Sequence, residues 1–303
     1  MFDIITLGSA TLDVYVKTDE EVRKHGKHND VCFRLGGKQL IQNVLITTGG
    51  GGTNTAVAFS RLGLKTGFAG VVGNDVHGNV ILSELRKEQV SFLGRVKNGV
   101  SGYSLIFPGH HDRTILTYKG VNDSLQLHDI QSGRFRTKWL YVGSEMGESF
   151  HTSLSVMRVA RKHGVRIAAN LSDYVASLGL KRLKAFVSLC DLLILNREEG
   201  EKLTGKKEIK DQLKMIYRAG ASVVVITNGA RPVWVYDGSV IMSQKVPMIK
   251  VVDSTGAGDA FASGFVYGQI KGKSVGMSVS YGLKEARAVL GKIGAKTALV
   301  RRL

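Results

Sequence analysis

A turn of very small residues stands between an apolar segment and a helical pattern near the C-terminus, at residues 253–259 (DSTGAGD). Such residues leave the backbone N–H groups of Gly256, Ala257 and Gly258 open at the start of a helix. Unpaired donors and the helix dipole favour an anion at that place. A carboxylate beside the anion can accept a proton from a hydroxyl that attacks a phosphate, and Asp259 is that carboxylate. The alternative is that Asp259 only caps the helix, because Asp is a favourable N-cap residue.

A second glycine-rich segment, residues 48–56 (TGGGGTNTA), also leads into a helical pattern. Four consecutive glycines allow a ligand to approach the backbone closely, although they equally suit a flexible hinge. Asn54 offers a donor and an acceptor to a polyol hydroxyl, or it caps the following helix. Asp13 follows the first apolar strand, and parallel sheets bind ligands outside the carboxyl ends of their strands. We therefore expect Asp13 to contact hydroxyl groups of a substrate, and Asn54 to do so if it is not a cap.

The elements that position these residues follow from short apolar runs that alternate with amphipathic patterns along most of the chain. The predicted strands are Phe2–Leu7, Gly67–Val72, Trp139–Val142, Arg166–Ala169, Leu192–Leu195, Ser222–Thr227 and Val233–Tyr236. The predicted helices are Thr53–Leu62, Val76–Gln89, Thr152–His163, Lys210–Ala219, Asp259–Ile270 and Ser274–Gly291. Near-continuous apolar strands separated by helices are typical of a parallel sheet covered on both faces. The sequence therefore predicts an α/β fold with a doubly wound, mainly parallel sheet.

Two regions, residues 14–48 and 101–118, interrupt this alternation with strand patterns around turns. The strands predicted there are Val14–Lys17, Val31–Leu35, Leu40–Thr47, Tyr103–Phe107 and Thr114–Tyr118, around turns near Gly26, at Gly36-Gly37 and over residues 108–112. We expect them to form a small sheet beside the core, a lid that excludes water from a reaction. The chain has neither an internal repeat nor a long polar linker, which predicts one domain over residues 1–303.

The composition excludes several classes of protein. Hydrophobic residues make up 43% of the chain and charged residues 22%, so a disordered chain is excluded. The net charge of +17 suits an enzyme that handles polyphosphate anions; the basic residues are scattered and lack interleaved aromatic residues, which disfavours a nucleic-acid site. Cys32 and Cys190 show no metal-ligand spacing, and no signal peptide or membrane-length apolar run is evident. We expect a cytoplasmic protein.

Six features stand in a fixed order along the chain: Asp13, Gly49–Asn54, Arg113–Ile115, Asn196–Glu199, Thr227–Gly229 and Asp253–Asp259. Together they resemble the motifs of the ribokinase family, also called the PfkB carbohydrate kinases. The resemblance covers nearly the whole chain, and residues 253–259 are its most specific part. It implies a doubly wound α/β core with a β-sheet lid. It also implies transfer of the γ-phosphoryl group of Mg-ATP to a hydroxyl of a sugar, a sugar phosphate or a nucleoside.

The resemblance further implies roles for individual residues. Asp259 would be the general base, and Gly256, Ala257 and Gly258 would hold the transferred phosphoryl group. Implied contacts to the acceptor come from Asp13, Gly50, Gly51 and Asn54, while Arg113 either neutralises phosphates or is a lid-surface arginine. Implied contacts to the nucleotide come from Asn196, Thr227, Gly229, Thr255 and Gly258. Glu199 would position Mg²⁺ through water, and Asp253 and Gly294 stand where a monovalent cation such as K⁺ could bind.

Two positions depart from the family pattern. Pro232 takes the last position of the nucleotide loop, where the family often has glycine, and this changes the expected loop geometry. Gly51 replaces the lysine that ribokinases tend to carry in the first glycine loop, which argues against ribose as acceptor. We expect a sugar kinase, with a nucleoside kinase or a sugar-phosphate kinase as alternatives. A non-catalytic ligand sensor and a basic nucleic-acid binder are alternatives from other classes, and pairing of two chains through the lid edges is a further expectation.

Overall fold

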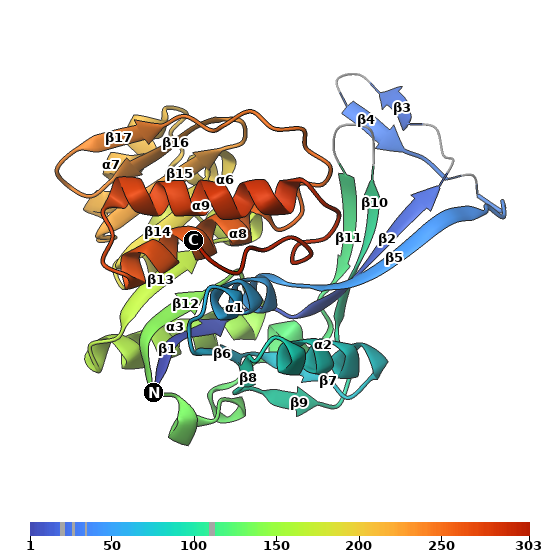
Figure 1. Ribbon diagram of the computed structural model, residues 1–303, viewed down its shortest axis with the longest axis horizontal. Helices are drawn as coiled ribbons and strands as arrows, with labels where there is room; N and C mark the ends of the chain where they lie inside the picture. The colour runs from blue at the N-terminus through green and yellow to red at the C-terminus, as the bar shows by residue number, and fades with distance from the viewer. Residues whose placement is uncertain (19–21, 26–27, 34, 109–112) are drawn as a thin grey trace.

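A nine-stranded sheet forms the centre of the larger part of the structure (Figure 1). The computed structural model describes residues 1–18, 22–25, 28–33, 35–108 and 113–303, without the side chains of residues 18, 22–25, 28–31 and 134. Across the sheet the strands follow the order β17 (Ile241–Gln244), β16 (Arg231–Tyr236), β15 (Val223–Asn228), β14 (Leu192–Asn196), β13 (Arg166–Asn170), β12 (Thr137–Val142), β1 (Phe2–Leu7), β6 (Thr66–Ala69) and β8 (Ser91–Phe92). Neighbours from β15 to β8 are parallel, whereas β16 and β17 run antiparallel at one edge. The predicted mainly parallel sheet is confirmed.

Helices cover both faces of this sheet because consecutive strand residues face opposite sides. On β1, Ile4 belongs to the apolar cluster of α8 (Ala257–Ile270) and α9 (Val275–Leu290). Its neighbour Ile5 belongs to the cluster of α3 (Gly147–Lys162), α5 (Gly179–Val187), α6 (Arg197–Thr204) and α7 (Ile209–Arg218). Helix α1 (Gly51–Arg61) packs against α8, and α2 (Val76–Lys87) lies beside the lid strands described next (Figure 1). The sheet is therefore doubly wound, as predicted.

A separate four-stranded sheet, which we call the lid, projects from the core at the right of Figure 1. Its strands follow the order β11 (Arg113–Tyr118), β10 (Gly102–Pro108), β2 (Thr11–Thr18) and β5 (Ile41–Gly49). The hydroxyl of Tyr15 donates a 2.9 Å hydrogen bond to Asp253 Oδ2, and the Arg113 guanidinium donates one to Ser254. The lid face that carries these two residues is therefore turned toward the start of α8. The predicted small second sheet is confirmed.

Three details of the predicted elements are wrong. The strand expected at Gly67–Val72 is split at Gly70, and its second half, β7 (Val71–Gly73), pairs with β9 (Arg95–Lys97) outside the main sheet. The backbone at Gly70 passes so close to Gly8 that a Cβ would lie 2.8 Å from the Gly8 carbonyl oxygen. The strand expected at Val31–Leu35 is replaced by a hairpin of β3 (Val22–His25) and β4 (His28–Val31).

The third wrong detail is the start of the strand expected at Val14–Lys17: β2 begins at Thr11, so Asp13, which follows β1 as expected, lies inside this lid strand. The turn expected near Gly26 and residues 109–112 of the second turn fall outside the described residues. Within the described ranges, no helix combines the length and the apolar character needed to cross a bilayer.

Candidate active site

Asp259 lies in the first turn of α8, at the place where α1 packs against this helix. Gly256 is the N-cap residue of α8, so Asp259 takes the third helical position and does not cap the helix. Asn54 lies within α1, whose N-cap is Gly50, and its Nδ2 donates a 2.8 Å hydrogen bond to Asp259 Oδ2. Both capping alternatives are therefore wrong, because the two side chains face each other instead.

Burial sets the proton affinity of Asp259. Burial raises the pKa of this carboxyl above the ordinary aspartate value, and the negative charge of Asp13 acts in the same direction. The hydrogen bond from Asn54 and the positive charge of Lys296 partly offset this rise in pKa. A carboxylate with a raised pKa is a stronger base than an ordinary one. Asp259 is therefore suited to accept a proton from a hydroxyl group placed beside it.

The turn before α8 has a conformation that requires glycine at Gly256. Its φ is +76°, and a Cβ there would lie 2.4 Å from the Ala295 Cβ. The N–H of Ala257 makes a long hydrogen bond of 3.3 Å to Ser254 O within the turn. A Cβ at Gly258 would meet no atom within 4 Å, so a ligand can reach the backbone there. Of the three positions expected to hold an anion, Gly258 has the backbone most accessible to a ligand, and Gly256 fixes the conformation of the turn.

Asp13 and the adjoining glycines form one wall of the site at the base of the lid. Asp13 is only 6% exposed, and burial raises its pKa, although the hydroxyl of Thr11 donates a 2.9 Å hydrogen bond to Oδ1. A Cβ at Gly49 would lie 1.9 Å from Asp13 Oδ2, so the chain passes directly against this carboxylate. Gly50 has a φ of +93°, and a Cβ there would lie 2.5 Å from Ser9 O. Gly49 is therefore required by its packing against Asp13, and Gly50 by its positive φ and its packing against Ser9 and Ala10.

Gly51 continues this wall up to Asp259. A Cβ at Gly51 would lie 3.6 Å from Asp259 Oδ1 and 3.9 Å from the backbone nitrogen of Ser144. Ser144 follows β12, whose carboxyl end adjoins that of β1. The sequence analysis did not single out Ser144. Its place two residues after the end of an apolar parallel strand is the signal that could have found it.

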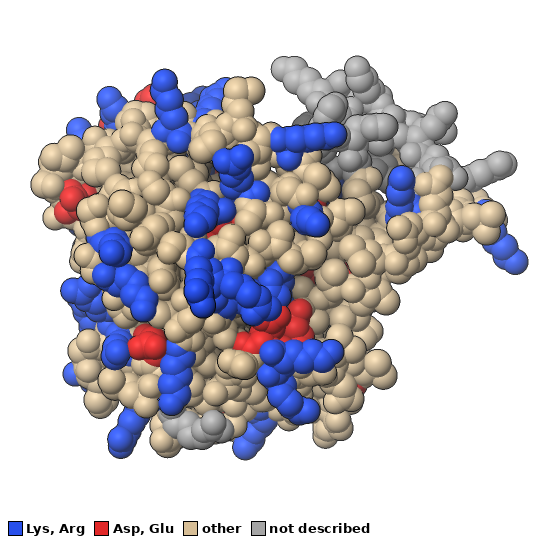
Figure 2. Space-filling model, viewed as in Figure 1, with Lys and Arg blue, Asp and Glu red and all other residues tan. Residues whose placement is uncertain are grey.

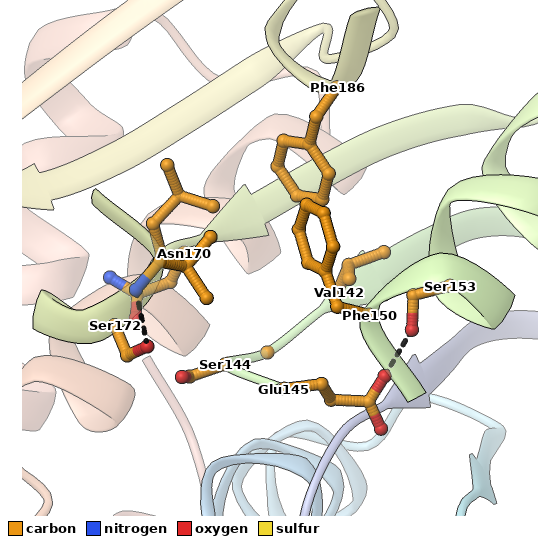
Figure 3. A pocket seen from close by; sticks show the side chains of 11 residues that line it. Val142, Ser144, Glu145, Phe150, Ser153, Asn170, Ser172 and Phe186 are labelled. Carbon is orange, nitrogen blue, oxygen red and sulfur yellow. Dashed lines mark hydrogen bonds between the residues drawn. The ribbon is translucent and has the colours of Figure 1, made fainter. Parts of the chain in front are cut away.

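Glu145, the next residue, lines a small pocket at the carboxyl ends of β12 and β13 (Figure 3). Its carboxyl group points toward α3 and is hydrogen-bonded to the hydroxyl of Ser153. The stacked rings of Phe150 and Phe186, 5.5 Å apart, form an apolar wall of the pocket. Burial raises the pKa of Glu145 to about 8. This buried acid beside the site was also missed by the sequence analysis.

An open cavity of about 410 Å³ lies at the carboxyl ends of β14 and β15. Its lining includes Asn196, Thr227 and Gly229, three of the five residues expected to contact a nucleotide, but not the other two, Thr255 and Gly258. Asn196 caps α6, because its Oδ1 accepts a 2.8 Å hydrogen bond from the N–H of Glu199. Glu199 Oε2 accepts a 2.8 Å hydrogen bond from the N–H of Asn196 in return. This capping box fixes both side chains at the edge of the cavity.

Pro232 lies just beyond this cavity, at the second position of β16. The pairing of β15 with β16 shifts register between Ile226 and Asn228, close to the proline in the hairpin. Proline lacks an N–H group and is tolerated at strand starts and bulges. The hairpin therefore accommodates Pro232 where its ladder is already irregular.

The Asp253 side chain ties the turn before α8 to the segment after α9. Its Oδ1 accepts hydrogen bonds from the N–H (2.9 Å) and hydroxyl (2.7 Å) of Thr255, and its Oδ2 accepts one from the Gly294 N–H (3.0 Å). Burial opposes the charge of Asp253, but these hydrogen bonds outweigh burial and hold its pKa below the ordinary value. The predicted pair Asp253 and Gly294 is thus in contact, and the Thr255 hydroxyl is already engaged by Asp253.

Arg113 reaches the site from the lid. It begins β11 on the lid face that is turned toward α8, and its guanidinium donates to the hydroxyl of Ser254. Ser254 directly precedes the turn that contains Gly256. The arginine therefore spans the gap between the lid and the start of α8, where its charge faces any anion bound at that turn.

The carboxylates beside the cavity carry negative charge that a cation could offset. Burial raises the pKa of Glu199 to about 7, and the negative charges of Asp173 and Asp259 add to the rise. Among the described residues, no group of three or more His, Cys, Asp and Glu side chains is arranged to hold a metal ion. Mg²⁺ commonly keeps several waters and binds through one or two carboxylates plus substrate phosphates. The residues present fit that mode of binding.

Comparison with known proteins shows which family, relatives and solved structures this chain is similar to. A sequence model of the family described as "pfkB family carbohydrate kinase" matches residues 1–301. An uncharacterized sugar kinase from Archaeoglobus fulgidus is 29% identical over 81% of this chain and 99% of its own length. A cytidine kinase from Thermococcus kodakarensis is 36% identical over 44% of this chain and 50% of its own length. The structure of an Arabidopsis thaliana ribokinase, complexed with ribose and ATP, has a TM-score of 0.79 and 22% identity over 99% of this chain and 96% of that one.

Proposed function

This chain belongs to the pfkB family of carbohydrate kinases, and we propose that it transfers the γ-phosphoryl group of Mg-ATP to a hydroxyl of a sugar. As a member of that family it is a phosphotransferase with an alcohol group as acceptor. The observation that carries the proposal is the 2.8 Å hydrogen bond between Asn54 and Asp259. Asp259 has a raised pKa and directly follows the open backbone of Gly258, which supports its proposed role as the base.

The proposed reaction begins with the acceptor bound between Asp13 and Asn54. Asp259 accepts the proton of the attacking hydroxyl, and the N–H groups at the start of α8 stabilise the charge on the transferred phosphoryl group. Arg113 adds a positive charge on the lid side, which helps this stabilisation. When bound, Mg²⁺ neutralises phosphate oxygens, and Glu199 would hold it through water. The closed lid keeps water from accepting the phosphoryl group.

The nucleotide is proposed to occupy the cavity at β14 and β15. Asn196, Thr227 and Gly229 line that cavity, and the Thr255–Gly258 turn would contact the terminal phosphates of the nucleotide.

We also propose that a monovalent cation such as K⁺ binds near Asp253 and Gly294. Because both oxygens of the Asp253 carboxylate are already hydrogen-bonded, backbone carbonyl groups would be its ligands there. We further propose a cytoplasmic location, because the sequence has two cysteines, Cys32 and Cys190, too few for a disulfide framework.

A nucleoside kinase is the second candidate, because the cytidine kinase of T. kodakarensis shares 36% identity with part of this chain. A nucleoside and a free sugar both offer hydroxyl groups to Asp13 and Asn54, and they differ in the base that the lid must cover. The test is mass spectrometry of reaction mixtures that contain Mg-ATP and one acceptor each, from ribose, hexoses, 2-keto-3-deoxygluconate, sugar phosphates and nucleosides. A phosphorylated sugar supports the proposal, a phosphorylated nucleoside favours the second candidate, and no phosphorylated acceptor contradicts both.

The activity is expected to fall at acidic pH in a range above the ordinary aspartate pKa. Asp259 must be ionised to accept a proton, and burial raises its pKa above 3.8. Lowering the pH through that raised pKa protonates the base, so kcat/KM for the acceptor should drop about tenfold per pH unit below it. The measurement is kcat/KM for the acceptor against pH at saturating Mg-ATP. An activity that stays constant down to pH 3.8 would contradict the assignment of Asp259 as the base.

We also propose that two chains pair through the outer face of the lid. That face exposes large apolar side chains: Val44 is 48% exposed, Ile46 58% and Leu116 55%. A contiguous apolar sheet face of this kind favours burial against an identical face of a second copy.

The Leu116→Lys variant is expected to dissociate that pair, because a lysine would bury its charge in the apolar contact. Light scattering after size-exclusion chromatography should show the mass of two chains for the wild type and of one chain for the variant. Ile293→Lys, at an exposed apolar residue outside the lid, serves as control and should keep the wild-type mass. A wild-type protein with the mass of one chain contradicts this proposal.

A further inference from the structure

Lys296 is a buried lysine that the proposed reaction does not yet use. It lies after α9 and is only 4% exposed. Its Nζ donates hydrogen bonds to Thr48 Oγ1 (2.8 Å), Thr53 Oγ1 (3.1 Å) and Glu84 Oε2 (2.7 Å). These partners belong to lid strand β5, to α1 and to α2. The ammonium group therefore links β5, α1 and α2 next to the glycine segment of the site, residues 49–52.

The contacts of Lys296 lead to the acceptor wall. Thr53, which accepts a hydrogen bond from Lys296, donates one of 2.5 Å to the carbonyl oxygen of Gly49. Gly49 is the residue whose backbone passes against the carboxylate of Asp13. Thr48 directly precedes Gly49 and donates to Glu84. Lys296 therefore holds the side chains of Thr48 and Thr53, which fix the backbone at Gly49. This backbone shapes the part of the site around Asp13.

The segment around Lys296 is anchored without its ammonium group. The carbonyl oxygen of Lys296 accepts a 2.6 Å hydrogen bond from Arg61 Nη1, and the same guanidinium is paired with Glu88. The N–H of Gly294 is held by Asp253. A buried ammonium costs more to desolvate than an apolar side chain of the same length. The charge of Lys296 is therefore not needed to hold this segment in place, and its effect lies elsewhere.

That effect is electrostatic as well as geometric. The charged groups around Lys296 include Glu84 on α2, Arg61 on α1 and Asp13 on β2, and its charge also acts on Glu88 and Asp259. Asp13 also faces Asp253, while Asp259 faces Asp13, and Glu199 lies within reach of Asp259. The positive charge of Lys296 lowers the pKa of both Asp13 and Asp259, against the burial that raises it. The two acidic residues of the site thus share one buried counter-charge.

We propose that Lys296 is a positioning residue for phosphoryl transfer: it holds the Thr48–Thr53 segment against Asp13 and offsets the negative charge of Asp13 and Asp259. This inference rests on the proposed function, because it assumes that these two carboxylates bind and deprotonate the acceptor. Glu84 tunes the effect, since it is the carboxylate that pairs with the ammonium. Lys296 and Glu84 therefore act on the site through other residues and do not touch the substrate.

The test compares Lys296→Met, which removes the charge but keeps the chain length, with Glu84→Gln, which removes the opposing charge. Carboxyl ¹³C NMR titration of Asp13 and Asp259 in the absence of substrates should show both pKa values higher than wild type in Lys296→Met. In Glu84→Gln both should be lower, because the charge of Lys296 is then less compensated. With an identified acceptor, its KM should rise about tenfold in Lys296→Met while KM for ATP stays unchanged. The exposed Lys292→Met is the control and should match wild type.

Opposite shifts of the Asp13 and Asp259 pKa values in the two variants support the proposal. The loss of a merely structural contact would not shift these pKa values in opposite directions. Unchanged pKa values of Asp13 and Asp259 in Glu84→Gln overturn it, and this variant decides the matter if Lys296→Met does not fold. An unchanged acceptor KM in a folded Lys296→Met also overturns it. Failure of the wild-type enzyme to phosphorylate any acceptor would contradict the proposed function instead, and the NMR titration distinguishes that outcome.

Discussion

Replacing Asp259 with asparagine is expected to lower kcat by about three orders of magnitude while ATP binding stays nearly unchanged. Asparagine has the shape of aspartate and can keep a hydrogen bond to Asn54, but it cannot accept a proton from the acceptor hydroxyl. The affinity for ATP should survive because the nucleotide cavity is lined by residues of β14, β15 and α6. Steady-state kinetics with the identified acceptor, combined with calorimetric titration of ATP, measure both quantities.

The matched control for Asp259→Asn is Glu285→Gln. Glu285 is fully buried on α9, and burial raises its pKa to about 7. It therefore shares with Asp259 a buried carboxyl group of raised pKa but lies outside the proposed site. This control should keep kcat within about threefold of wild type, as expected for a site away from the reacting groups. Equal losses of ATP binding and turnover in Asp259→Asn would show that Asp259 has a structural role.

Replacing Gly256 with alanine is expected to lower kcat by about a hundredfold or more, comparable to the loss of a donor from an oxyanion hole. The new Cβ would lie 2.4 Å from the Ala295 Cβ and 2.7 Å from its Cα, so the turn must shift. A shift of this turn moves the N–H groups of Ala257 and Gly258 away from the transferred phosphoryl group. Kinetics at saturating ATP and acceptor, together with thermal denaturation, separate the loss of turnover from the loss of stability.

The control for Gly256→Ala lies at the other end of the same helix. Gly272 also has a positive φ, +65°, but a Cβ there would meet no atom within 4 Å. Gly272→Ala therefore introduces backbone strain of about 1 kcal/mol without a steric clash. It should lower the melting temperature slightly and leave kcat unchanged. If both variants lose turnover to the same extent, strain rather than the shape of the turn explains the effect.

The sequence predicted the main sheet well because its strands are buried on both faces and are therefore apolar throughout. Leu192–Leu195 is such a run, and it forms most of β14. Several short elements were missed, among them α5 and α6, which are nine and eight residues long, because so short a segment gives few repeats of the helical period. The split at Gly70 depends on the close approach of Gly8, which no local pattern reveals.

The part of the candidate site that could be predicted is the part whose turn, helix start and acid lie within one short segment. The segment Gly256–Asp259 combines a left-handed glycine, a helix start and an acid, and the structure places these features together. Asn54 was expected either to bind substrate or to cap α1, and only the packing of α1 on α8 shows that it faces Asp259. Glu145 and Lys296 could not be predicted from the spacing of residues along the chain. The raised pKa of Glu145 results from burial, and the contacts of Lys296 are with residues distant in the sequence. Lys296 in particular is 248 residues from Thr48, to which it is hydrogen-bonded.

The measurement that tests the central claim most directly is ADP release from Mg-ATP, recorded with and without each acceptor for the wild type and for Asp259→Asn. We predict that one hydroxyl-bearing acceptor stimulates ADP release by the wild type well above the rate without acceptor. The same acceptor should have almost no effect on Asp259→Asn, although this variant still binds ATP. If ATP binds to the wild type and no acceptor stimulates ADP release, or if Asp259→Asn responds as the wild type does, the account of Asp259 as the base of an acceptor kinase is wrong.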